Sequence, residues 1–80
     1  MSSTTMELFA KVTRVEGCLE GLLQTLSRAG LQVIDMSAQP SLDMAFYFIR
    51  MHLEGAKEVP QLEKTLADLS SVRCVEVLAA

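Results

Sequence analysis

The feature that most constrains the fold is a change of hydrophobic period, from two residues to about 3.6 and back, which occurs twice. From Met6 to Arg14 apolar and polar side chains alternate, which predicts a half-buried strand. Leucines then recur at helical spacing between Cys18 and Ala29, which predicts a helix. Gly30 directly follows this stripe, where a left-handed glycine commonly ends a helix. The chain is therefore expected to turn from helix to strand at Gly30.

Two more strands, a second helix and a last strand are predicted after Gly30. A turn at "AQPS", around Pro40, separates the two middle strands. Pro60 is tolerated in the first turn of the second helix, where its missing N–H is not needed. Residues 72–78 are rich in β-branched side chains, which predicts the final strand. The middle strands are expected at 31–37 and 44–53, and the second helical stripe consists of Val59, Leu62, Leu66 and Leu69.

This order of elements predicts an α+β fold. A single shift of the sequence lays Leu19, Leu23 and Leu26 onto Leu62, Leu66 and Leu69, as if one unit were used twice. Two split β-α-β units with right-handed crossovers form a four-stranded antiparallel sheet with both helices on one face. The prediction is thus a ferredoxin-like βαββαβ sandwich over residues 6–80, preceded by a disordered N-terminal segment over residues 1–5.

The strand at 44–53 has apolar side chains on both faces. One row holds Tyr47 and Ile49, and the other holds Phe46 and Phe48; the pattern alone does not decide which row faces the helices. Either choice leaves apolar side chains on the uncovered face of the sheet, which favours a partner. A domain of 80 residues also has a small core that oligomerisation often completes. We therefore expect at least a homodimer.

Composition disfavours several function classes. A net charge of −3 repels nucleic acid, and no apolar run approaches the roughly 20 residues of a membrane-spanning helix. The "MSSTT" start lacks the features of a signal peptide, so a cytoplasmic chain is expected. Cys18 and Cys74 form no CxxC motif, and His52 has no nearby carboxylate or cysteine in the sequence. We expect no metal, no cofactor in this chain and no enzyme activity.

The loop "RVEGCLEG" is a candidate ligand site. Gly17 permits a tight turn into the helix, whose first free N–H groups suit a carboxylate such as that of an amino acid. The alternative is that Gly17 only makes the turn. A further alternative concerns "FYFIRM", whose aromatic side chains are similar to those with which RNA-recognition domains of the same strand order stack bases.

The stretch "VEGCLEGLLQTLSRAGLQVIDMS" resembles the opening of an ACT domain, and the resemblance extends from Met6 to Leu78. Within that family, Arg28, Gly30 and Met36, followed by an Ala-Gln-Pro turn, are most similar to the short, single-domain small subunit of acetohydroxyacid synthase (acetolactate synthase). The resemblance implies a noncatalytic regulatory subunit for branched-chain amino-acid biosynthesis. It would dimerise through its second strand and activate a large catalytic subunit that depends on thiamine diphosphate. A free-standing ACT module that senses an amino acid is the alternative.

The resemblance also implies an effector site, consisting of Arg14, Glu16, Gly17, Cys18, Leu19, Gln32 and Val33. Valine-sensitive relatives have asparagines that hold the effector where this chain has Arg14 and Gln32. Arginine cannot accept a hydrogen bond from the effector's ammonium group, and glutamine places its amide one methylene farther out. We therefore expect valine to bind weakly or not at all.

Overall fold

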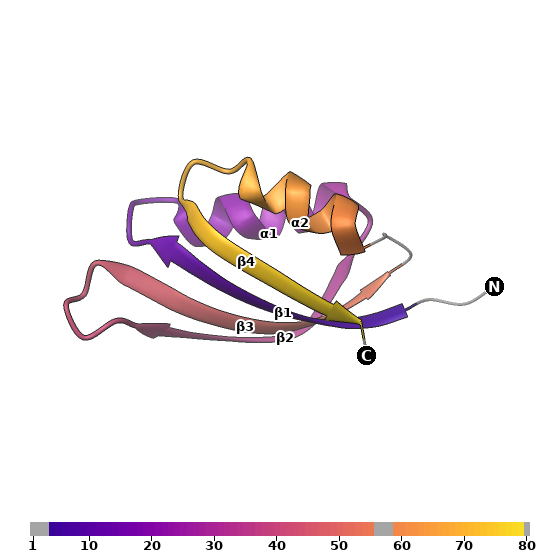
Figure 1. The fold of residues 1–80 in the computed structure, drawn as a ribbon, viewed down its shortest axis with the longest axis horizontal. Coiled ribbons are helices and arrows are strands. Elements are labelled where there is room, and N and C mark those ends of the chain that lie inside the picture. Colours follow the sequence, from indigo (N-terminus) through magenta and orange to yellow (C-terminus); the bar gives the residue numbers. More distant parts are fainter. Residues whose placement is uncertain (1–3, 56–58, 80) are drawn as a thin grey trace.

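The computed structural model describes residues 4–55 and 59–79, which form four strands and two helices in the predicted order (Figure 1). All pairings in the single sheet are antiparallel, the strand order is β2-β3-β1-β4, and both helices cover one face. The predicted ferredoxin-like βαββαβ fold is therefore confirmed. The elements are β1 (Thr4–Thr13), α1 (Cys18–Arg28), β2 (Gln32–Pro40), β3 (Phe46–Gly55), α2 (Val59–Ala67) and β4 (Val72–Ala79).

Several predicted boundaries differ from the structure; the third strand, for example, is expected at 44–53 and is observed at Phe46–Gly55. Thr4 and Thr5, expected in a disordered N-terminal segment, already belong to β1 and pair with the end of β3; residues 1–3 lie outside the described residues. β2 continues through the expected turn as far as Pro40, which lies opposite Tyr47. Proline is tolerated there because β2 is an edge strand, which has a neighbour on one side only. The turn itself consists of residues 41–45.

Gly30 ends α1 as predicted. Its φ angle is 81°, in the left-handed region that favours glycine. The Gly30 amide donates to the Ser27 carbonyl, and the Leu31 amide donates to the Leu26 carbonyl, each at 3.0 Å. These two hydrogen bonds form a Schellman motif, which satisfies carbonyls at the helix end and directs the chain into β2.

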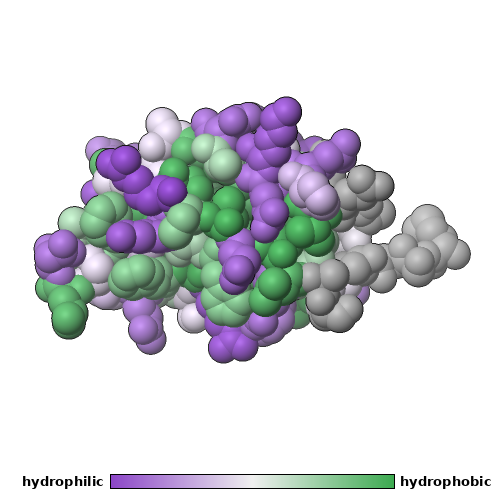
Figure 2. Space-filling model, in the orientation of Figure 1, coloured by the Kyte–Doolittle hydropathy of each residue, from purple (hydrophilic) through white to green (hydrophobic). Residues whose placement is uncertain are grey.

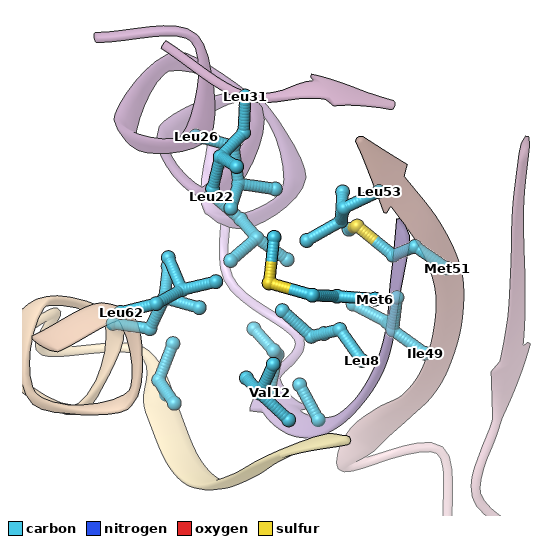
Figure 3. Packing of buried hydrophobic residues seen from close by; sticks show 14 of the residues in the cluster. Met6, Leu8, Val12, Leu22, Leu26, Leu31, Ile49, Met51, Leu53 and Leu62 are labelled. Carbon is cyan, nitrogen blue, oxygen red and sulfur yellow. The ribbon is translucent and has the colours of Figure 1, made fainter. Parts of the chain in front are cut away.

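The core lies between the sheet and the helices (Figure 3). Ile49, Met51 and Leu53 on β3 are buried, and they face buried leucines of both helices such as Leu22 and Leu62. The Tyr47 and Ile49 row of β3 therefore faces the helices, and Phe46 and Phe48 lie on the opposite face. Neither helix of the described ranges is long and apolar enough to cross a membrane.

Candidate functional site

The loop from β1 to α1 forms a compact turn centred on Gly17. Gly17 has a φ angle of 79° and caps α1 without a side-chain hydrogen bond. The Cys18 amide donates to the Val15 carbonyl at 3.1 Å, so this N–H is already used. Within residues 4–55 and 59–79, no backbone acceptor is found for the amides of Leu19 and Glu20. An anion at this helix end would therefore bind to those two N–H groups.

The other side chains of this loop differ in their availability. The Cys18 side chain is buried and not available to a ligand, and the Leu19 side chain packs partly against the core. Glu16 is exposed. Arg14 is exposed too, but its Nη1 donates to the Met44 carbonyl at 2.8 Å, and its guanidinium carbon lies 5.1 Å from the centre of the Tyr47 ring. The guanidinium is thus held against the β2–β3 turn.

Gln32 and Val33 lie at the opposite end of the sheet from this loop. Gln32 is paired with Glu54, whereas Thr13, just before the loop, is paired with Phe46. At about 3.4 Å per residue, Phe46 and Glu54 are separated by about 27 Å along β3. The structure therefore brings the predicted residues 14–19 together, but it does not bring Gln32 and Val33 to them within one chain.

The free edge of β2 carries two exposed apolar side chains, Ile34 and Met36, which are 53% and 38% exposed. The register shifts between Val33 and Asp35, so Ile34 is the extra residue of a β-bulge and has no partner on β3. The sequence analysis could not locate this bulge, because "LQVIDMS" does not alternate strictly between apolar and polar residues. The exposed, apolar edge makes β2 available for pairing with another strand.

His52 has carboxylate partners that the sequence analysis did not find. Its Nδ1 lies 2.7 Å from Asp35 Oδ1 on β2, and its Nε2 lies 3.2 Å from Glu7 Oε2 on β1. The same Glu7 oxygen accepts a hydrogen bond from Arg50 Nε at 2.8 Å and lies 2.7 Å from Arg50 Nη2 in a salt bridge. These four side chains tie together three strands on the face of the sheet opposite the helices. Antiparallel pairing brings them together from segments far apart in the sequence.

The comparisons with known proteins show the fold. No family model and no curated protein matches the sequence. A formyltetrahydrofolate deformylase from Pseudomonas putida KT2440 superposes with a TM-score of 0.79 at 17% identity, over 95% of this chain and 29% of the deformylase. The C-terminal domain of the MgtC protein from Mycobacterium tuberculosis gives 0.73 at 17% identity, over 96% of this chain and 87% of that one. An ACT domain protein from Streptococcus pneumoniae gives 0.68 at 19% identity, over 99% of this chain and 92% of that one. This chain therefore has the ferredoxin-like fold of ACT domains.

Proposed function

We propose that this chain is the noncatalytic regulatory subunit of an acetohydroxyacid synthase, and that it raises the activity of the large, thiamine-diphosphate-dependent subunit. The observation that carries the proposal is the segment from Val15 to Ser37, whose sequence resembles that of the small subunit. This segment forms the glycine turn, the helix, the Schellman motif at Gly30 and the edge strand in that order. Similarity to the ACT domain protein supports the fold on which this proposal depends.

The exposed edge of β2 supports a homodimer. If two chains pair antiparallel along β2, the start of one β2 lies beside the end of the other. Gln32 begins β2, and Pro40 ends it opposite Tyr47, near the β1–α1 loop that contains Arg14. Such pairing would bring Gln32 of one chain toward the loop of the other and complete an effector site from two chains. This arrangement accounts for the separation of these residues within one chain.

The contacts of Arg14 refine the expectation for valine. Since its guanidinium donates to the Met44 carbonyl, the helix N-terminus stays open to a carboxylate. The amide that would accept from the effector's ammonium group is nevertheless missing, and each neutral hydrogen bond contributes on the order of 1 kcal/mol. We therefore propose that valine binds weakly or not at all, and that the assembled enzyme resists inhibition by valine.

The activity assay measures pyruvate consumption by the purified cognate large subunit with and without this chain. We expect a higher rate with the chain present and no activity from the chain alone. An unchanged rate together with no co-purification would overturn the proposal. If the isolated chain nevertheless bound an amino acid, those same results would favour the free-standing ACT sensor.

Valine binding is tested by titration calorimetry on the native chain and on a double variant, Arg14→Asn with Gln32→Asn, which has an asparagine at both positions, as the valine-sensitive relatives do. The double variant is expected to bind valine at least tenfold more tightly than the native chain, because it gains about 1 kcal/mol for each new hydrogen bond. Saturable valine binding in the low micromolar range by the native chain would contradict this expectation.

A further inference from the structure

The sheet face opposite the helices is aromatic at its centre. Here we call it the open face and define it by Phe9, Lys11, Phe46, Phe48 and Arg50. Phe9 on β1 is 37% exposed and Phe48 on β3 is 52% exposed, and these two strands are the central pair of the sheet. Large apolar side chains concentrated on a flat, uncovered surface are typical of an interface.

Three surface hollows on the open face meet at Phe48. One of about 330 Å³ includes Phe9 and Lys11, and a second of about 390 Å³ runs past Lys11 to Leu42 in the β2–β3 turn. A third of about 280 Å³ is lined by Phe9, Phe48 and Arg50. The open face and the β2–β3 turn therefore form one continuous surface with Phe48 at its centre.

The β2–β3 turn ends this surface and presents an apolar side chain to solvent. Leu42 is fully exposed, and the hairpin extends past the helices (Figure 1), with hydrophobic atoms protruding at its tip (Figure 2). The Ser41 hydroxyl donates to Asp43 Oδ1 at 2.6 Å, and the Ala45 amide donates to the same oxygen at 3.0 Å. These hydrogen bonds lower the pKa of Asp43, and they hold the turn backbone in one conformation in this structure. A preorganised turn loses little entropy when Leu42 enters a pocket.

The charge of Lys11 restricts which partners can cover this surface. Its Nζ lies 4.3 Å from the centre of the Phe46 ring and 6.0 Å from that of Phe48. Within the part of the chain that the structure describes, Lys11 forms no salt bridge, whereas Arg50 is paired with Glu7. Any molecule that covers the two rings also removes the Lys11 ammonium from water, which is costly unless a carboxylate meets it.

We infer that the open face and Leu42 dock a protein segment that combines apolar side chains with a carboxylate for Lys11. This inference rests on the proposed function, and the occupant is then the large catalytic subunit. The main alternative is a second copy of this chain. Glu7, Asp35 and Asp43 on this surface already bind groups of their own chain, but the exposed Glu76, which lines the same hollow as Lys11, could meet the partner's Lys11. Nucleic acid fits less well, because these carboxylates and the net charge of −3 repel phosphate.

The inference is tested with the purified large subunit as the probe and titration calorimetry as the measurement. Phe48→Ala and Lys11→Glu are expected to weaken binding by about thirtyfold or more, as is typical of central interface residues. Lys11→Arg keeps a positive charge over the Phe46 ring and is expected to bind more tightly than Lys11→Glu. Arg28→Glu, an equal charge reversal on the exposed surface of α1, serves as the control and is expected to change little. Circular dichroism checks that each variant is folded.

The outcomes separate this inference from the proposed function. If the native chain does not bind the large subunit, the proposed function fails, and the docking inference fails with it. If the native chain binds and Phe48→Ala and Lys11→Glu bind equally well, only the docking inference is overturned. Loss of self-association in these variants, with unchanged large-subunit binding, would assign the surface to a second copy. Tight binding of a single-stranded oligonucleotide that Phe48→Ala abolishes, again with unchanged large-subunit binding, would assign it to nucleic acid.

Discussion

Replacing Ile34 by lysine is expected to break the proposed homodimer and leave the fold of each chain intact. Ile34 is the bulged residue of the edge strand β2 and is 53% exposed, so it contributes little to the core of its own chain. Fully burying an isoleucine side chain contributes about 1.5–3 kcal/mol, so covering its exposed half contributes about 1 kcal/mol. A symmetric dimer covers two Ile34 side chains, so together they contribute about 2 kcal/mol, which corresponds to about thirtyfold in the dimer Kd. Lysine adds like charges at the edge, so thirtyfold is a lower bound.

Sedimentation equilibrium measures the dimer Kd of the native chain and of Ile34→Lys, and circular dichroism checks the fold. Ile34→Val is the matched control, since it removes one methylene and is expected to change Kd by less than about fivefold. Val33→Lys is expected to destabilise the fold instead, because Val33 packs against the core. A native chain that is monomeric at tens of micromolar would refute the dimer. An Ile34→Lys chain that dimerises as tightly as the native one would refute the role of the β2 edge.

Three further predictions concern the fold and the hairpin turn. Leu62→Ala is expected to lower the free energy of unfolding in urea by about 2–5 kcal/mol, because Leu62 is completely buried; a loss below 1 kcal/mol would contradict the described packing. Gly55→Ala is expected to lower it by about 1–3 kcal/mol, since a Cβ there would collide with the Leu31 side chain; an equally stable variant would contradict that contact. Folding lowers the pKa of Asp43, so the ionised Asp43 carboxylate stabilises the turn. This stabilisation is complete above the ordinary aspartate pKa, about 4, and is lost as the pH falls through the lowered pKa. The Ala45 amide signal in NMR should report this loss in the native chain, and Asp43→Ala should show the altered signal already at neutral pH; a signal that does not move with acid would contradict it.

The order of elements could be predicted from the sequence because hydrophobic period and glycine conformation are local properties. The leucine stripe ending at Gly30 contains the whole signal for α1 and its Schellman motif within about a dozen residues. The two leucine stripes likewise predicted both helices, and the right-handed crossovers of two β-α-β units placed them on one face of the sheet. The candidate anion site at Gly17 came from the same local pattern and stays a prediction; within residues 4–55 and 59–79 the Leu19 and Glu20 amides at this helix end have no backbone acceptor.

Only the tertiary structure decided which row of β3 faces the helices, that β2 continues to Pro40, and that Ile34 bulges from the edge. It also placed Asp35 and Glu7 beside His52, and Lys11 over the Phe46 ring. Each of these depends on the register between strands, which is set by packing among residues far apart in the chain. The separation of Arg14 from Gln32 has a different origin. Both flank α1, and this helix runs along the strands, so the chain leaves one end of the sheet before the helix and enters the other end after it.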